Sequence, residues 1–364
     1  MERRELLELA RRVLSLPTAP YHEHEVRALV VEHCRKLGLR VEVDRVGNVI
    51  VKYQRSQAER LRHRASLAPL VFVAHMDHPG FEALGPHRAE FLGGVPMELF
   101  NGARVRFFVD GRVVRAKVKR VDAAAWPKQK IVELKADGRA QSAPRRGDIG
   151  MWDVQAFRVA NRKLHATAID DVLSVVVVLA ALTEVARRRL KTHVWGVFTR
   201  AEEVGFQGAV ELARSGKIPR AALVISMEMS RERPWARIGD GVVVRVGDRM
   251  TTFDAAATWF LHETARASGI EAQRCLMDGG TCEATAFAGF GYRVGGLCLP
   301  LGNYHNIGKA MKPQAEYVSI DDLVQLVRLS VAAASAWKRL PAIVARLSAR
   351  VRQIHAGAPR ELRR

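Results

Sequence analysis

Acidic residues and histidines follow several apolar runs of the sequence, where predicted strands end or helices begin. Two neighbouring glutamates, Glu202 and Glu203, follow the run HVWGVFT, and His75 follows LVFVA. The set is completed by Asp77, Asp170, Asp171, Glu228 and His305. In α/β sheets, ligands bind at the carboxyl ends of the strands. We therefore expect these side chains, which come from separate connections, to meet at one edge of one sheet.

Each member of this set has an ordinary explanation when it is taken alone. Acids at the start of a helix stabilise the helix dipole by roughly 0.3–1 kcal/mol, and Asp170 with Asp171 could cap a helix. Taken together, so many carboxylates would repel one another unless a cation compensated their charge. Imidazole and carboxylate ligands suit Zn²⁺, Co²⁺ or Mn²⁺, and hydrolases hold two such ions roughly 3.5–4 Å apart. The set therefore predicts a site for two divalent metal ions.

The elements that must position these residues alternate between strand-like and helix-like patterns. Such alternation predicts an α/β fold with a mostly parallel sheet flanked by helices. We expect strands at 69–75, 193–199, 221–227 and 293–299, and helices at 171–189, 206–215, 254–268 and from Ser319 onward.

The segment 88–155 has a different sequence pattern, with short β-prone runs separated by Gly, Asp and Pro. It predicts a small β-barrel or sandwich inserted into the larger domain. The expected division is thus a discontinuous catalytic domain (1–87 and 156–340), the β-rich insert (88–155) and a basic C-terminal helix or tail (341–364).

Composition limits the classes of partner. The net charge is +20, but the excess arginines are scattered and no aromatic residues interleave with them, so we expect no nucleic-acid partner. The longest apolar stretch, 175–186, is too short to span a bilayer, so no membrane partner is expected. No signal peptide is evident, and Cys34, Cys275, Cys282 and Cys298 show no disulfide spacing. These features predict a cytoplasmic protein whose cysteines are small core residues.

Several motifs resemble those of one family. VAHMDHPGF resembles the AHMDEIGF motif of the tetrahedral aminopeptidases, the dinuclear metallo-exopeptidases that include glutamyl, lysyl and deblocking aminopeptidases. ATAIDD resembles their ALDDR segment, and TRAEEVGFQGA resembles TxQEEVGLRGA. DGGTCEA resembles GGTDA, and CLPLGNYHN resembles IPLRYMHS. The resemblance covers the chain to about residue 335 and implies a phosphorylase/hydrolase-like catalytic domain with an inserted β-rich domain.

The resemblance also implies a role for each ligand. His75 would bind one metal ion and His305 the other, with Asp170 bridging the two. Glu203 would bind the ion held by His305, and Glu228 the ion held by His75. The ions would be zinc or cobalt.

Two further residues would assist the reaction. Glu202 would be the general base that activates a metal-bridging water, and Asp77 would orient the imidazole of His75 by a hydrogen bond. The activity implied is removal of N-terminal residues from peptides by a homo-oligomer. We expect the β-rich insert to form subunit contacts, so that the chain is at least a dimer.

Three positions depart from the family pattern. Glu228 replaces an aspartate, His78 replaces the acid of AHMDE, and GNYHN lacks the arginine of RYMHS. Glutamate at the Glu228 position tends to accompany carboxypeptidases and acylamino-acid hydrolases. The alternatives are therefore a carboxypeptidase, an N-acyl-amino-acid amidohydrolase, or a noncatalytic scaffold that retains the fold.

Overall fold

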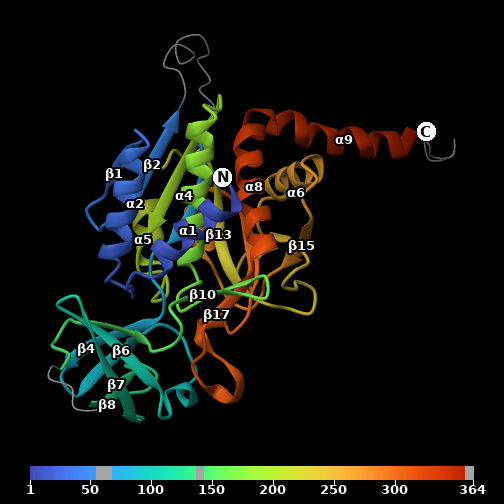
Figure 1. Cartoon of the computed structure of the whole chain (residues 1–364). Helices are drawn as coiled ribbons and strands as arrows, with labels where there is room; N and C mark the ends of the chain where they lie inside the picture. Colours follow the sequence, from blue (N-terminus) through green and yellow to red (C-terminus); the bar gives the residue numbers. More distant parts are fainter. Residues whose placement is uncertain (55–67, 137–142, 357–364) are drawn as a thin grey trace.

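The computed structural model describes residues 1–54, 68–136 and 143–356 (Figure 1). Its largest sheet has eight strands in the order β1-β2-β12-β3-β13-β16-β14-β15. Their bounds are β1 Arg40–Val43, β2 Val49–Gln54, β3 Leu70–His75, β12 His193–Thr199, β13 Leu223–Arg231, β14 Val242–Gly247, β15 Ala272–Leu276 and β16 Arg293–Leu301. The central strands β12, β3, β13 and β16 pair in parallel, which confirms the predicted fold class.

Parallel pairing brings the carboxyl ends of these strands to one edge. Thr199 at the end of β12 lies opposite His75 at the end of β3, and Glu202 follows shortly after Thr199. Strand β13 runs further than the predicted 221–227 because β16 pairs with it as far as Arg231. Glu228 therefore lies within β13 rather than in the connection after it.

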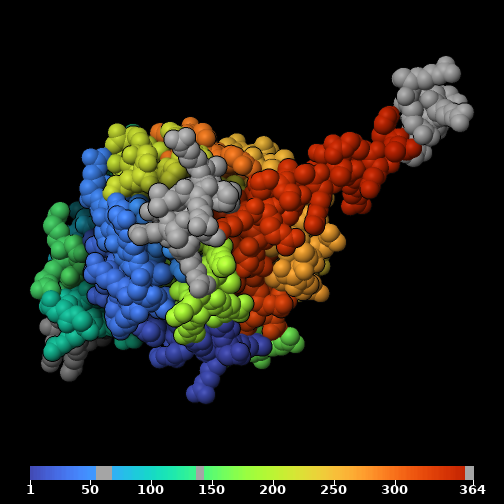
Figure 2. All heavy atoms as spheres, turned by 90° about the horizontal axis from the view of Figure 1, so that it is seen from above, coloured from blue at the N-terminus to red at the C-terminus, as the bar shows by residue number. Residues whose placement is uncertain are grey.

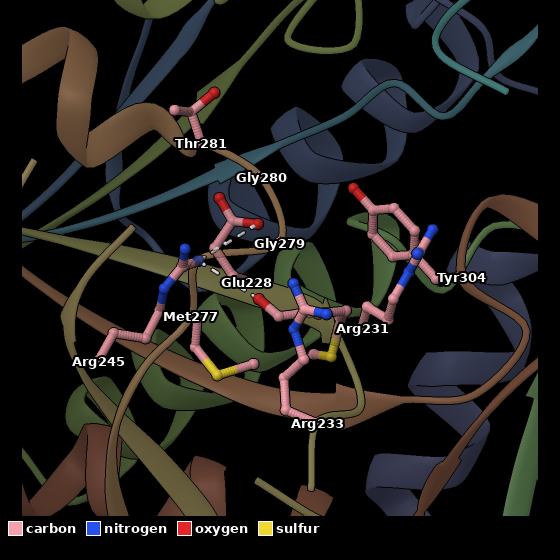
Figure 3. A pocket seen from close by; sticks show the side chains of 11 residues that line it. Glu228, Arg231, Arg233, Arg245, Met277, Gly279, Gly280, Thr281 and Tyr304 are labelled. Carbon is pink, nitrogen blue, oxygen red and sulfur yellow. Dashed lines mark hydrogen bonds and ion pairs between the residues drawn. The ribbon is translucent and has the colours of Figure 1, made fainter. Parts of the chain in front are cut away.

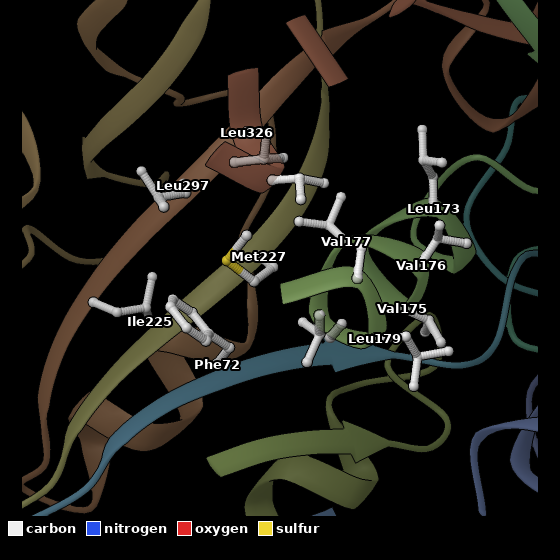
Figure 4. Close-up of a cluster of buried hydrophobic side chains, with 14 of the residues drawn as sticks. Phe72, Leu173, Val175, Val176, Val177, Leu179, Ile225, Met227, Leu297 and Leu326 are labelled. Carbon is white, nitrogen blue, oxygen red and sulfur yellow. The ribbon is translucent and has the colours of Figure 1, made fainter. Parts of the chain in front are cut away.

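Helices cover both faces of the sheet. On one face, α1 (Arg3–Leu14), α2 (His24–Lys36), α4 (Val172–Arg187), α6 (Ala255–Ala267) and α8 (Ile320–Ala336) share a large hydrophobic core with the strands. On the other face lie α5 (Gln207–Ser215) and α7 (Glu283–Gly289). Figure 4 shows α4 residues such as Val177 beside Phe72 and Met227 of the sheet. Helix α4 is buried over nearly its whole length, as its almost continuous apolar sequence predicts.

The sequence signals for helix ends agree with the structure. The Ser319 side chain caps α8 by accepting a hydrogen bond from the backbone N–H of Asp322, at 3.2 Å. Asp254 caps α6 in the same way through Ala257. Helix α5 ends at Gly216, whose φ of +70° is the left-handed conformation that favours glycine.

A second structural unit is a closed barrel of strands in the order β4-β5-β8-β7-β6-β9 (Figure 1). Their bounds are β4 Gly80–Gly85, β5 Arg88–Leu92, β6 Arg104–Val109, β7 Arg112–Val121, β8 Ile131–Ala136 and β9 Ile149–Trp152. Phe81, Phe91, Phe100 and Trp152 fill its core with mutual ring contacts. The barrel confirms the inserted β-rich unit, although β4 begins before residue 88. The division into domains stays a prediction, and residues 137–142 of the insert lie outside the described residues.

A small antiparallel sheet joins two strands that follow the barrel to a strand near the end of the chain. It consists of β10 (Phe157–Ala160), β11 (Lys163–Ala166) and β17 (Glu316–Ser319), in that order. Pairing of β11 with β17 places Ala166 opposite Glu316. This sheet therefore fixes the segment before Asp170 against the segment before α8.

The last described helix, α9 (Leu340–Ala356), projects from the body of the protein (Figures 1 and 2). It occupies most of the predicted basic C-terminal segment, and residues 357–364 lie outside the described residues. Among the described helices, none combines the length and the apolar character needed to cross a bilayer. All four cysteines are free, and only Cys275 is partly exposed, so the other three are core residues as predicted.

Candidate metal centre

The expected carboxylates and histidines do meet at the carboxyl edge of the sheet. Single ligand atoms of His75, Asp170 and Glu203 lie within 4.8 Å of one another, as do those of His75, Glu202 and Glu228. A third such group joins Asp170, Asp171 and Glu228. His305 adjoins the first group through Asp170 and Glu203.

Asp170 lies between the two histidines. Its Oδ1 is 3.8 Å from Nε2 of His75, and its Oδ2 is 3.4 Å from Nε2 of His305. The two oxygens of one carboxylate thus face two different imidazole nitrogens. This is the arrangement expected of a carboxylate that bridges two metal ions.

Both histidines present the same nitrogen to the centre. Nδ1 of His75 donates to the backbone oxygen of Asp77 at 3.1 Å, and Nδ1 of His305 donates to the backbone oxygen of Gly94 at 2.8 Å. These bonds leave Nε2 of each ring available as a ligand atom. Gly94 follows barrel strand β5, so the barrel side of the molecule helps to orient His305, which lies in the loop after β16.

The neighbouring glutamates face different histidines. Oε2 of Glu202 is 3.8 Å from Nε2 of His75, while Oε1 of Glu203 is 3.3 Å from Nε2 of His305. Neither glutamate belongs to a helix, because α5 begins only at Gln207. The helix-dipole explanation therefore does not account for this acidic pair. Glu202 is as close to His75 as Asp170 is, so its assignment as the general base stays a prediction.

The side chain of Asp77 contacts the two glutamates as well as His75. Its carboxylate is 3.4 Å from Nδ1 of His75 and accepts backbone N–H bonds from Glu202 and Glu203, at 3.0 and 3.1 Å. Burial alone would raise the pKa of Asp77, but the His75 ring and the two N–H donors lower it. Asp77 therefore fixes the turn that carries both glutamates.

The electrostatics of the centre favour a bound cation. Burial, together with neighbouring carboxylates, raises the pKa values of Glu202 and Asp171, and that of Glu228 to about 8. Nε2 of His305 and Oδ1 of Asp171 are buried without a hydrogen-bond partner among the described residues. Asp171 stands at the N-cap of α4, yet its side chain makes no capping bond there. The carboxylate oxygens and imidazole nitrogens of the centre, including the two atoms without a hydrogen-bond partner, therefore fit divalent metal ions as ligands.

Residues 47–329 match the family model described as M42 glutamyl aminopeptidase. The chain belongs to this family. It is accordingly a peptide hydrolase. Over 261 residues it is 23% identical to the lysyl aminopeptidase of Pyrococcus furiosus, covering 66% of this chain and 73% of that protein.

Solved structures share the fold of this M42 chain. The TET1 peptidase of Pyrococcus horikoshii, described as assembling into a tetrahedron or an octahedral shell, superposes with a TM-score of 0.72 at 20% identity. This match covers 90% of this chain and 99% of that one. An aminopeptidase from Desulfurococcus kamchatkensis gives a TM-score of 0.73 at 24% identity, covering 92% and 95% of the two chains.

The sequence did not predict that Glu316 contacts the candidate metal centre. This buried residue of β17 accepts backbone N–H bonds from Ile169, Asp170 and His305, at 2.7, 2.9 and 2.8 Å. It therefore ties the segment carrying Asp170 to the loop carrying His305. Burial and the nearby charge of Asp170 raise its pKa. The segment AEYVS contains no motif that could have indicated this contact.

His78, one of the departures from the family pattern, makes a similar connection. Its Nδ1 contacts the backbone oxygen of Asp170, and its Nε2 lies 2.9 Å from Oδ1 of Asn306. Asn306 in turn donates to the backbone oxygen of Thr167 at 2.8 Å. His78 thus holds the Asp170 segment and the His305 loop together from a second side.

Proposed function

We propose that this M42 chain is an aminopeptidase that depends on two divalent metal ions, zinc or cobalt. His75, Glu228 and Asp170 would hold one ion, and His305, Glu203 and Asp170 the other. The observation that carries the proposal is that the two oxygens of Asp170 face Nε2 atoms of two histidines. Bound ions would polarise the scissile carbonyl and lower the pKa of a water molecule.

The chain's own residues would then move the proton and hold the geometry. The Glu202 side chain, which is 10% exposed, lies at the centre, where it would accept a proton from the attacking water and deliver it to the leaving amine. Asp77 would keep Glu202 and Glu203 in place through their backbone N–H groups. Glu316 would fix the positions of Asp170 and His305.

One observation keeps a second activity in view. Position 228 holds glutamate, which tends to accompany carboxypeptidases and acylamino-acid hydrolases, and this side chain lies 3.9 Å from the buried guanidinium of Arg245. A noncatalytic scaffold is disfavoured, because each expected ligand position holds a competent residue and these residues adjoin one another.

The test is a set of four peptides that share one sequence. Each carries either a free or an acetylated amino terminus, and either a free or an amidated carboxyl terminus. Zn²⁺, Co²⁺ and Mn²⁺ are supplied separately to protein stripped with a chelator. An aminopeptidase cleaves both peptides with a free amine and neither acetylated one. Cleavage that requires the free carboxylate instead would establish the carboxypeptidase alternative, and no metal-dependent cleavage would support the scaffold.

We also propose that the chain forms a homo-oligomer and acts on peptides in the cytoplasm. Free cysteines are consistent with a reducing compartment. The proposal of an oligomer is supported by the shells described for the Pyrococcus horikoshii peptidase. It is not supported by an excess of exposed apolar side chains on the barrel. Trp235 and Met250, both outside the barrel, are more exposed than Val113 of β7. A monomer in light scattering at micromolar concentration would contradict this proposal.

A further inference from the structure

A tyrosine directly precedes one of the proposed metal ligands. When CLPLGNYHN is aligned with IPLRYMHS on the shared histidine, Tyr304 takes the place of the methionine. Tyr304 also lines a pocket beside the centre together with Glu228, a proposed ligand of the other ion (Figure 3). A methionine side chain offers no hydrogen-bond donor, whereas a phenol offers an O–H group. This departure from the motif therefore adds a donor beside both proposed metal ions.

The ring of Tyr304 contacts two other side chains. It stacks on the imidazole of His305, with ring centroids 3.9 Å apart and an angle of 19° between the ring planes. The guanidinium of Arg231 lies 5.1 Å from the tyrosine ring centroid, within the range of a cation–π contact. Because Nε2 of His305 faces Asp170 and Glu203, the tyrosine ring lies against a side chain of the centre itself.

The backbone of this loop also fixes the position of Tyr304. Its neighbours Asn303 and His305 have φ values of +56° and +54°, in the left-handed region that residues other than glycine rarely adopt. Nδ2 of Asn303 donates to the backbone oxygen of Ala315 at 2.8 Å, and the backbone N–H of His305 donates to Glu316 at 2.8 Å. Such conformations persist where surrounding contacts impose them, and they cluster at active sites and ligand clamps. The loop therefore holds the tyrosine in a preorganised position.

The hydroxyl group of Tyr304 is free to bind another molecule. Within the described residues, the structure gives this hydroxyl group no hydrogen-bond partner. A Cβ atom at Gly280 would lie 3.9 Å from its oxygen, so the hydroxyl group is close to the glycine segment that also lines the pocket (Figure 3). The ordinary pKa of a phenol is about 10, so at neutral pH the group keeps its proton and can donate it in a hydrogen bond.

We propose that Tyr304 is a catalytic residue whose hydroxyl group donates a hydrogen bond to the oxyanion of the reaction. This inference rests on the proposed function and adds a residue to its mechanism. When the oxygen of water bonds to the scissile carbonyl carbon, the π electron pair of the carbonyl moves to its oxygen, which becomes negative. Tyr304 would hold this oxygen without giving up its proton. The electron pair returns to the carbonyl as the bond to the leaving amine breaks. A donor aimed at developing charge lowers the barrier more than it strengthens substrate binding.

The experiment compares Tyr304→Phe with the wild-type protein, both loaded with metal. Phenylalanine keeps the ring that stacks on His305 and removes only the hydroxyl group. The matched control is Tyr317→Phe, because Tyr317 pairs with Gly302 of the same loop but does not line the pocket. Turnover of leucyl anilide gives kcat and KM, and elemental analysis gives the metal content. Calorimetry measures the dissociation constants of two ligands that cannot be cleaved. One is the phosphonic acid analogue of leucine, which is tetrahedral and anionic, and the other is leucinol, which has no anionic oxygen.

The expected result is a loss confined to the oxyanion. Tyr304→Phe should lower kcat by roughly 10²–10³-fold, the usual effect of removing one oxyanion donor, while KM stays close to the wild-type value. Its affinity for the phosphonic acid should fall by roughly 10- to 150-fold, as expected for one hydrogen bond to a charged group. Its affinity for leucinol and its metal content should not change, and Tyr317→Phe should resemble the wild-type protein in every measurement.

The outcomes separate this inference from the proposed function. The proposed function is decided by the four peptides and the wild-type protein, without any change at Tyr304. If Tyr304→Phe retains the wild-type kcat and affinity for the phosphonic acid, the inference is wrong and the aminopeptidase stands. A raised KM with weaker leucinol binding and an unchanged kcat would assign the hydroxyl group to substrate binding instead. Loss of metal from Tyr304→Phe would assign it to the assembly of the centre. Either of these results would also overturn the inference.

Discussion

Replacing Asp77 by asparagine should damage both stability and metal binding. The buried carboxylate of Asp77 accepts two backbone N–H bonds, at 3.0 and 3.1 Å, from the glutamates of the centre. Asparagine keeps one acceptor but turns an N–H₂ group toward the other N–H donor. One hydrogen bond to a charged group is lost and one buried donor is left unpaired, which together cost about 3–5 kcal/mol.

A loss of this size is a large part of the stability of an ordinary domain, about 5–15 kcal/mol. The free energy of unfolding is measured by urea denaturation, and bound metal by elemental analysis. Asp240→Asn is the control, because Asp240 is exposed and a surface change of this kind shifts stability by only about 0.5 kcal/mol. If Asp77→Asn unfolds like this control and binds its metal equally well, Asp77 does not fix the turn that carries the glutamates.

Three further variants test the packing, an acid-sensitive loop and a metal ligand. Gly196→Ala should lower the free energy of unfolding, measured by urea denaturation, by about 1–3 kcal/mol, because its Cβ would lie 2.7 Å from Cδ1 of Leu182. A Cβ at Gly289 meets no atom within 4 Å, so Gly289→Ala is the control and should not destabilise the protein. Equal stabilities of the two variants would contradict the close packing of Gly196 against Leu182. Burial would raise the pKa of Asp248, but the hydrogen bonds that its carboxylate accepts outweigh this effect and lower the pKa. The ionised carboxylate therefore stabilises the fold above the usual pKa of 3.8, and this contribution is lost as the pH falls through the lowered pKa. The difference in the free energy of unfolding between wild type and Asp248→Asn should therefore shrink on acidification. A difference that stays constant with pH would show that the Asp248 carboxylate does not stabilise the fold in this way. Glu228→Asp should fold normally but alter metal affinity or substrate preference, and unchanged values for both would show that Glu228 is not a ligand.

Local patterns were sufficient to predict most elements and the residues that gather at the centre. The apolar runs before His75 and Glu202 are strands, and parallel pairing brings their ends together, as the alternation of elements indicated. Ser319 and Gly216 marked helix ends because capping depends on residues close in sequence. The division of roles between Glu202 and Glu203 depended on the family resemblance and stays a prediction.

Contacts between distant segments could not be predicted from these patterns. Glu316 meets the Asp170 segment only because β17 pairs with β11, and nothing in the local sequence indicates that pairing. Gly94 orients His305 through a backbone oxygen, which carries no sequence signal. The extension of β13 past Glu228 likewise depends on its partner β16, whose pairing with β13 continues beyond the predicted strand end.

The most direct test of the proposed centre compares Glu202→Gln with Glu203→Gln. If Glu202 is the general base, its glutamine variant retains two metal ions per chain and binds substrate, but turns over roughly 10²–10⁴-fold more slowly. If Glu203 is a ligand, its glutamine variant loses one ion first and regains part of its activity at high metal concentration. Both variants are measured by elemental analysis and by turnover at saturating metal. A fully active Glu202→Gln protein, or a Glu202→Gln protein that is the one to lose metal, would contradict the account.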